Sequence, residues 1–168
     1  RSVSAEYELK EFIRSSEIIR RMHERELNNE WLIKILRKRP MRSVSGIVNI
    51  AIMTTSGCPH GRCTYCPKGE NAPNSYTGFE PATMRGIQNS FDSYAQVQSR
   101  LQQLREIGHA TDKCELIVQG GTFLAQPPEY QEKFIKGMYD ALNERQSATL
   151  QDAITANESA RNRCIGLT

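Results

Sequence analysis

Apolar residues recur at helical spacing near the start of the chain. One helix is predicted over 6–25 by the apolar positions Leu9, Phe12, Ile13, Ile19 and Met22. A second, short helix is predicted by Trp31, Leu32, Ile35 and Leu36, with Asn28 or Asn29 as its N-cap and Pro40 as its end. Together they predict a separate helical arm over residues 1–43.

Beyond the arm the pattern changes to strands that alternate with helices. Strands are predicted at 47–53, 115–119 and 164–168. The helices between them are marked by Tyr94, Val97, Leu101 and Leu104, then by Tyr130, Phe134, Met138 and Leu142, then by the stretch at about 150–162. This order predicts an α/β fold whose parallel strands are joined by right-handed crossovers. Because three strands leave an open edge, we expect residues 44–168 to be the first part of a larger TIM-like (β/α) barrel.

Two loops with chemical potential follow the first two predicted strands. A cysteine-rich loop follows Met53, and the turn Gly120-Gly121-Thr122 follows the second strand. Ligands of parallel sheets gather at the carboxyl ends of the strands. The glycines suit either a tight strand-to-helix turn or a close approach of the backbone to a ligand. We expect both loops to lie at the same edge of the sheet.

The net charge of +3 is distributed unevenly along the chain. Residues 1–43 hold eleven Lys or Arg against seven Glu, and the remaining residues hold eleven against twelve acids. Five cations without an intervening acid stand close together: Lys34, Arg37, Lys38, Arg39 and Arg42. Such a run is either a solvated face, with some charges favouring a helix C-terminus, or a contact for nucleic-acid phosphates.

Three of the five cysteines, Cys58, Cys63 and Cys66, lie within nine positions. This clustering favours metal ligation over a disulfide framework and indicates a reducing, cytoplasmic setting. Three thiolates suit an iron–sulfur cluster that keeps one iron open, whereas a closed zinc site needs a fourth ligand. His60, Cys114 and Cys164 are weaker candidates for that ligand, and the two cysteines are expected to be buried apolar residues. Zinc stays open as the main alternative.

Several motifs resemble the family of the catalytic subunit of Elongator, a tRNA wobble-uridine carboxymethyltransferase also called a tRNA uridine acetyltransferase. The motifs are Cys58-Pro-His-Gly-Arg-Cys63-Thr-Tyr-Cys66-Pro, Ser75-Tyr-Thr-Gly-Phe-Glu-Pro, the stretch from Leu104 to Lys113, Gly120-Gly-Thr-Phe-Leu-Ala-Gln-Pro and Cys164-Ile-Gly-Leu-Thr. The resemblance runs from about Met41 to Thr168, and the arm before it is similar to the family's tRNA-binding part. The short spacing between the first two cysteines is typical of archaeal or bacterial members.

The resemblance implies a radical S-adenosylmethionine (SAM) barrel that acts with a C-terminal acetyltransferase domain, which is not in this chain. It implies that Cys58, Cys63 and Cys66 hold a [4Fe–4S] cluster, with Tyr65 and Gly120-Gly121-Thr122 on the SAM side and Lys113 at acetyl-CoA. The C-x4-C-x2-C spacing is one residue longer than the usual radical-SAM pattern.

The expected function is therefore formation of 5-carboxymethyluridine at the wobble position, with tRNA and acetyl-CoA as partners. The five cations of the arm are expected to contact tRNA. The alternative is a tRNA-binding scaffold that holds zinc or no metal. No stretch approaches the roughly 18 apolar residues of a membrane span, so no membrane partner is expected. Assembly with a second copy or with further Elongator-type subunits is left open.

Overall fold

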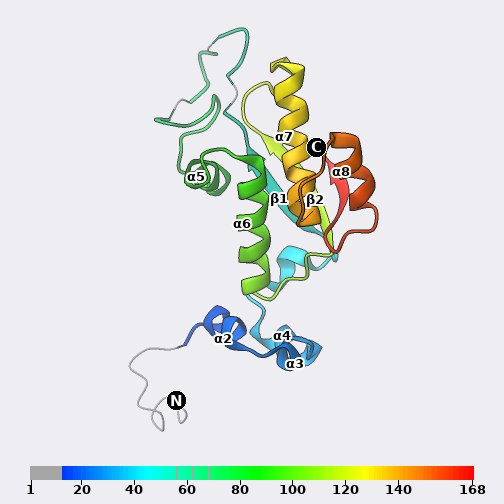
Figure 1. The fold of residues 1–168 in the computed structure, drawn as a ribbon. Helices are drawn as coiled ribbons and strands as arrows, with labels where there is room; N and C mark the ends of the chain where they lie inside the picture. Colours follow the sequence, from blue (N-terminus) through cyan, green and yellow to red (C-terminus); the bar gives the residue numbers. More distant parts are fainter. Residues whose placement is uncertain (1–12, 56, 62, 68) are drawn as a thin grey trace.

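The computed structural model describes every residue from 13 to 168 except 56, 62 and 68. Figure 1 shows a parallel sheet with helices packed against it and a small helical arm below. In chain order the elements are α2 (Ser15–Arg21), α3 (Glu24–Leu27), α4 (Glu30–Leu36), the 3₁₀ helix η1 (Pro40–Ser43), β1 (Val48–Met53), α5 (Pro81–Gln88), α6 (Ser93–Glu106), β2 (Lys113–Gln119), the 3₁₀ helix η2 (Phe123–Ala125), α7 (Pro128–Asn143), α8 (Leu150–Asn157) and β3 (Arg163–Leu167).

The sheet has the strand order β1-β2-β3, and both strand pairs are parallel. Every second residue of β1 and β2 points into one core, as the pleat of a strand requires. On β1 these residues are Val48, Ile50 and Ile52, which are fully buried. The same core includes buried residues of α6 and α7, namely Val97, Leu101, Leu104, Phe134, Met138, Ala141 and Leu142.

The other face of the sheet is less well covered. Asn49 is exposed and Ala51 is only half-buried, although both lie in the same strand as the buried residues. On β2 the alternate positions Glu115 and Ile117 are also half-buried. A sheet covered by helices on one face is the wall of a barrel whose remaining strands are not in this chain. The prediction of an α/β fold with parallel strands and a helical arm is confirmed.

The first predicted helix is wrong in its extent. In the described part, α2 ends at Arg21, because Met22 and His23 are both extended. The chain then turns into α3, where the Glu26 carboxylate accepts a hydrogen bond from the His23 amide at 2.9 Å. The segment of the prediction before residue 13 lies outside the described residues.

The next two helix predictions differ only at their ends. Asn29 is the N-cap of α4, since its Oδ1 accepts a hydrogen bond from the Leu32 amide at 3.1 Å. The last helix, predicted to about residue 162, ends at Asn157, whose side chain accepts from the Cys164 amide at 2.7 Å. The side chain of Asn157 therefore takes part in ending the helix and starting β3.

The arm is fastened to the turn between α6 and β2. The Arg37 Nε donates to the Gly108 carbonyl at 2.9 Å, and the Lys38 amide donates to the Ile107 carbonyl at 3.1 Å. His109 is buried between the Ser43 hydroxyl and the Lys38 carbonyl, at 2.6 and 3.0 Å. These bonds hold the basic segment against the amino end of β2.

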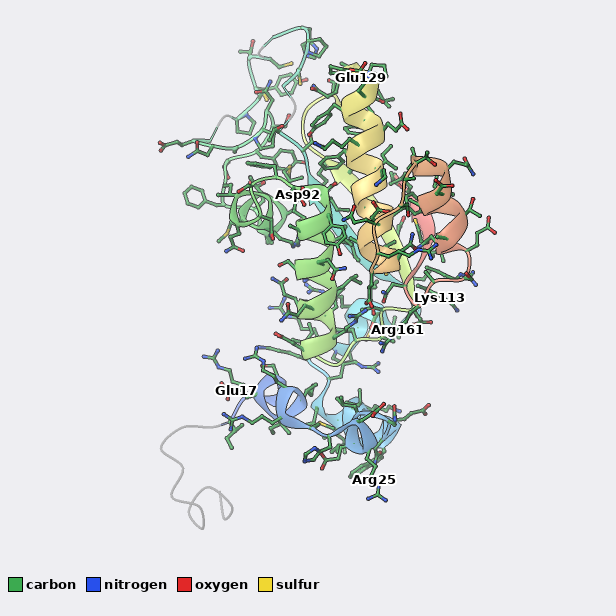
Figure 2. All side chains as sticks on the ribbon, viewed as in Figure 1. Glu17, Arg25, Asp92, Lys113, Glu129 and Arg161 are labelled. Atoms are coloured by element: carbon green, nitrogen blue, oxygen red, sulfur yellow. The ribbon has the colours of Figure 1, made fainter. Side chains whose placement is uncertain are left out.

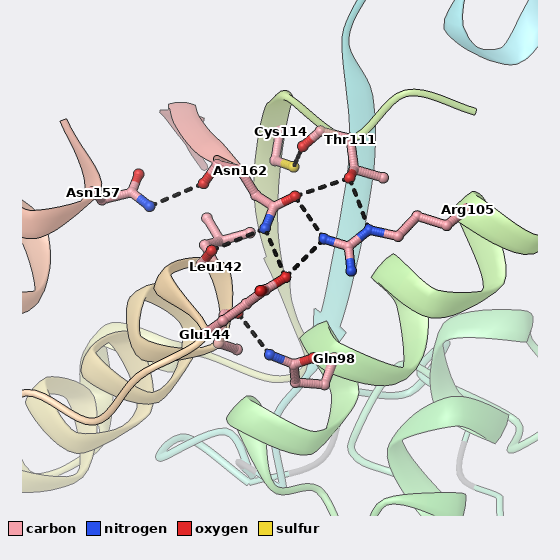
Figure 3. A network of polar contacts seen from close by, with 9 residues as sticks. Gln98, Arg105, Thr111, Cys114, Leu142, Glu144, Asn157 and Asn162 are labelled. Atoms are coloured by element: carbon pink, nitrogen blue, oxygen red, sulfur yellow. Dashed lines mark hydrogen bonds and ion pairs between the residues drawn. The ribbon is translucent and has the colours of Figure 1, made fainter. Parts of the chain in front are cut away.

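The C-terminal part is held by a buried polar network around Asn162 (Figure 3). Its Oδ1 accepts hydrogen bonds from Arg105 and Thr111, each at 2.9 Å. Its Nδ2 donates to the Leu142 carbonyl at 3.0 Å and to Glu144 at 3.4 Å. One side chain thus joins α6, the loop before β2, the end of α7 and the segment that enters β3.

Candidate functional site

The loop that follows β1 carries all three clustered cysteines. β1 ends at Met53, and the next amide, that of Thr54, continues the ladder with a 2.8 Å bond to the Gln119 carbonyl. The loop then leaves the sheet at the carboxyl ends of the strands and returns at α5 (Figure 1). Cys58, Cys63 and Cys66 are half-buried free thiols in this loop.

Cys58 lies against the turn that follows β2, as the parallel order of the strands predicts. Its thiol accepts hydrogen bonds from the Thr122 hydroxyl and the Thr122 amide, and these bonds lower the pKa of Cys58 below its ordinary value. The Gln126 side chain also reaches the loop, with its amide 3.4 Å from the Gly57 carbonyl. The structure therefore joins the cysteine loop to the Gly120-Gly121-Thr122 turn. Gly120 in that turn has φ of 144°, a backbone conformation that favours glycine.

The other two cysteines have partners within their own loop. The Cys63 sulfur lies 3.4 Å from His60 Nε2. The Cys66 sulfur accepts a hydrogen bond from the Ser75 amide at 3.0 Å and lies 3.4 Å from the Ser75 hydroxyl. Each of the three sulfur atoms thus has a different neighbour.

The donor chemistry of the loop suits a metal cluster, because three thiols are what iron–sulfur clusters and zinc bind. In the part of the chain that the structure describes, however, no three His, Cys, Asp or Glu side chains are grouped to hold a metal ion. Binding a cluster would require the loop to bring its three sulfur atoms together. The loop has the right atoms, and its conformation here is not that of a formed site.

Glu80 fastens the far end of this loop, and the sequence analysis did not single it out. Its carboxylate accepts bonds from the Thr77 amide and hydroxyl at 2.8 and 2.7 Å, from the Gly78 amide at 3.1 Å and from the Thr83 hydroxyl at 3.0 Å. These bonds, led by that of the Thr77 amide, lower the pKa of Glu80 to about 2. The Thr-x-x-Glu spacing before Pro81, the pattern of a capping box, is the signal that could have revealed it.

A close backbone approach gives the loop its hairpin form. The Gly69 amide donates to the Tyr76 carbonyl at 3.0 Å, and a Cβ on Gly69 would stand 1.8 Å from the Thr77 carbonyl oxygen. Only glycine fits there. Around this hairpin the large side chains of Tyr65, Phe79 and Leu124 are 81–89% exposed. The predicted SAM-side residue Tyr65 therefore projects into solvent near the cysteines, where it is free to contact a ligand.

Lys113 lies away from this edge. It is the first residue of β2, whereas the Gly120-Gly121-Thr122 turn follows the last. Figure 2 shows Lys113 beside Arg161, at the opposite end of the sheet from Glu129 at the start of α7. Lys113 is exposed there. The structure thus does not bring the predicted acetyl-CoA residue together with the predicted cluster and SAM residues.

The basic segment occupies the same end of the sheet as Lys113. Its exposed cations are Lys34, Lys38, Arg39 and Arg42. Arg37 differs, because it is half-buried and its Nε is bonded to the Gly108 carbonyl. Arg37 holds the arm in place, and the four exposed side chains are available to a partner. The predicted RNA-binding residues and the cysteine loop therefore lie at opposite ends of the sheet.

A hollow of about 420 Å³ lies between α6 and α7. Its walls include Tyr94, Tyr130 and Phe134, and Lys133 and Lys136 reach it from α7. Lys136 is paired with the buried Asp140 at 2.6 Å. None of the predicted site residues lines this hollow. Among the described residues, no helix is both long and apolar enough to cross a membrane.

Known protein-family profiles do not match the chain. Individual proteins do. The tRNA uridine(34) acetyltransferases of Methanocaldococcus infernus and Methanocaldococcus jannaschii are 49% and 46% identical over 159 residues, which are 91% of this chain and 29% of each of those proteins. Elongator complex protein 3 of Drosophila melanogaster is 41% identical over 148 residues, which are 82% of this chain and 27% of that protein. The chain thus spans less than a third of the length of these relatives.

One solved structure is similar in fold as well as in sequence. It is the Elp3 of Methanocaldococcus infernus with an N-terminal deletion of residues 1–46. The alignment has a TM-score of 0.54 and 37% identity, and it covers 73% of this chain and 22% of that one. At this identity the similarity supports a common fold.

Proposed function

The chain belongs to the family of the tRNA uridine(34) acetyltransferases and Elongator complex protein 3, and from this premise we propose that it is part of a radical-SAM enzyme that modifies the wobble uridine of tRNA. The chain contributes the first strands of the barrel and the arm. One observation carries the chemical part of the proposal. Three free thiols lie in one loop at the carboxyl end of β1, and this loop is bonded to the turn after β2.

Cys58, Cys63 and Cys66 would hold a [4Fe–4S] cluster. When bound, such a cluster supplies the electron for reductive cleavage of SAM. The chain's own residues would position the reactants. Thr122 lies against Cys58 and so links the β2 turn to the ligand loop, and Gly120 keeps that turn free of side chains. Tyr65 stands next to the last cysteine with an exposed ring that could stack on the adenine of SAM.

The loop is attached at both ends, which supports a change of shape between them. Gln126 and Thr122 hold it near Cys58, and Glu80 holds it before α5. Gathering three sulfur atoms between these attachments breaks only the contacts of Cys63 with His60 and of Cys66 with Ser75. Those exposed contacts are weak compared with thiolate–iron bonds.

The product and the second substrate are also proposals. We propose 5-carboxymethyluridine as the product and acetyl-CoA as the source of the added group, with Lys113 contacting acetyl-CoA. Since Lys113 lies at the opposite end of β2 from Thr122, acetyl-CoA bound there would reach the cluster only through a part of the protein beyond this chain. We propose a cytoplasmic location, which the five free cysteines support.

The arm would bind tRNA through its exposed cations. Four of them project from the end of the sheet that carries Lys113, and none takes part in the ion pairs of the described residues. A tRNA bound there and at the cysteine edge would lie along the length of the sheet. This arrangement suits a long substrate with the reactive base far from its phosphate contacts.

Anaerobic reconstitution of the complete protein tests the chemical part. We expect about four irons per chain, and 5′-deoxyadenosine after reduction with dithionite in the presence of SAM. Replacement of any one of the three clustered cysteines by Ala should remove both signals, whereas the matched control Cys114→Ala should keep them, because Cys114 is buried at the other end of β2. Stoichiometric zinc in place of iron would favour the scaffold. Iron retained in Cys58→Ala but lost in Cys114→Ala would refute the ligand assignment.

A further inference from the structure

The arm exposes an aromatic side chain that the fold does not use. Trp31 is 69% exposed, although it lies in α4 and is the single tryptophan of the chain. The structure gives its ring no aromatic contact and its indole N–H no hydrogen bond among the described residues. Leu32, Ile33 and Leu36 are the half-buried side of the same helix. Trp31 therefore points away from the packing that holds α4.

Trp31 is surrounded by positive charge. Lys34 is three residues further along α4 and thus on the same side of the helix, and it is exposed. The chain then continues directly into the exposed cations Lys38, Arg39 and Arg42. From residue 31 to residue 43 the chain has no acid, and Glu30 at the start of the helix is the nearest one in sequence.

An exposed aromatic ring beside lysines and arginines is the combination that binds single-stranded nucleic acid. Bases stack on the ring while the cations neutralise the adjoining phosphates. Phosphate contacts alone would explain the cations but not the ring. A membrane surface is a poor match, because α4 has only seven residues and offers a small apolar face.

We propose that Trp31 is a stacking platform for an unpaired base of RNA, and that Lys34 holds a phosphate next to that base. The inference rests on the proposed function, since it takes tRNA as the RNA, and it extends that function from charge contacts to the recognition of a base. The platform selects single-stranded loops over duplex RNA. Its occupant is an unpaired nucleotide of the substrate, at the end of the sheet away from the cysteine loop.

The affinity of the complete protein for three RNAs tests the inference: unmodified tRNA, a single-stranded oligonucleotide and a duplex of equal length. Trp31→Ala should weaken binding of tRNA and of the single strand roughly 5- to 150-fold, the range measured for loss of one base stack. It should leave duplex affinity and the salt dependence of binding unchanged. Trp31→Phe should keep most of the affinity. Ile35→Ala is the matched control, because Ile35 is also exposed on this helix and should not stack.

Fluorescence separates the competing occupants. The emission lost in Trp31→Phe should be that of a water-exposed indole and should be quenched when the single strand is added. A component that is shielded from acrylamide without RNA would mean that another protein surface covers Trp31, which overturns the inference. Equal weakening by Ile35→Ala would also overturn it, in favour of an apolar protein contact.

The two proposals fail in different ways. If the wild-type protein binds tRNA and Trp31→Ala binds it equally well, the stacking platform is wrong and the proposed function stands. If the wild-type protein does not bind tRNA at all, the proposed function is wrong and the platform is wrong with it.

Discussion

Replacing Asn162 should loosen the C-terminal part of the fold more than any surface change. Asn162 is fully buried, and its side chain makes four hydrogen bonds to different elements (Figure 3). In Asn162→Ala the helix α7 loses the donor for its Leu142 carbonyl, and Thr111 loses the acceptor for its hydroxyl proton. Arg105 loses less, because it keeps Glu144 at 2.9 Å.

The expected cost follows from the groups left without a partner. Two buried polar groups lose their hydrogen bonds, at about 1–3 kcal/mol for each group. Because the cavity left by the side chain can admit a water that satisfies one of them, we expect a loss of roughly 2–5 kcal/mol. If the region around β3 opens as a unit, its amides should exchange about 30- to 5,000-fold faster.

Hydrogen exchange of the complete protein, followed by mass spectrometry, measures this effect. The affected peptides should be those that cover the end of α7, α8 and β3, including the Cys164 amide that bonds Asn157. Peptides of β1 should change less. Asn49→Ala is the matched control, because Asn49 is exposed, and it should change exchange little. Wild-type exchange rates in Asn162→Ala would show that the network does not hold β3.

Three further predictions concern the arm and the loop. Burial is the main cause that lowers the pKa of His109, so the unfolded chain binds the proton more readily and stability should fall as the pH drops below about 6.5; urea unfolding between about pH 7.5 and 5 should show this slope, and His109→Gln should lack it. In Glu80→Ala the amides of Thr77 and Gly78 should exchange faster than in the control Glu70→Ala, and because the pKa of Glu80 is lowered to about 2, the wild-type protection should be complete above about pH 4.5 and should disappear as the pH falls toward 2. Neutralising exposed cations of the arm should lower the log–log salt slope of tRNA binding by somewhat less than one unit for each phosphate that is no longer neutralised, and a variant with an unchanged slope would show that these cations are only a solvated face; they are Lys34, Lys38, Arg39 and Arg42.

Elements with a long and regular apolar pattern were predictable from the sequence. The helices α6 and α7 follow their 3.6-residue spacing, and β1 follows its run of β-branched residues. The meeting of the cysteine loop with Thr122 was also predictable, because parallel strands place their carboxyl ends at one edge. The cluster itself, the cofactors and the RNA contacts are still predictions.

The break in the arm was not predictable from periodicity. Apolar spacing continues through Ile19 and Met22, whereas the helix stops at Arg21. The restart depends on Glu26 binding the His23 amide, and His is not among the residues preferred at an N-cap. Asn162 likewise has no local signal, because a polar residue after a helix is normally expected to be exposed. Its burial arises from partners that are up to 57 positions away.

The separation of the two functional ends is a tertiary result. Lys113 and Thr122 are close in sequence, yet the seven-residue strand β2 places them at opposite edges. The basic segment reaches the Lys113 edge only through contacts such as Arg37 with Gly108. A sequence pattern marks such residues as candidates, and only the fold shows which of them share a site.

The wobble nucleoside of tRNA provides the most direct test of the central claim. The complete protein, reconstituted with iron and sulfide, would be incubated anaerobically with tRNA, SAM, acetyl-CoA and dithionite, and position 34 would be analysed by mass spectrometry. The account predicts the mass gain of a carboxymethyl group on uridine with the wild-type protein and with Cys114→Ala, and none with Cys58→Ala. The same product from Cys58→Ala, or from wild-type protein that holds zinc and no iron, would contradict it.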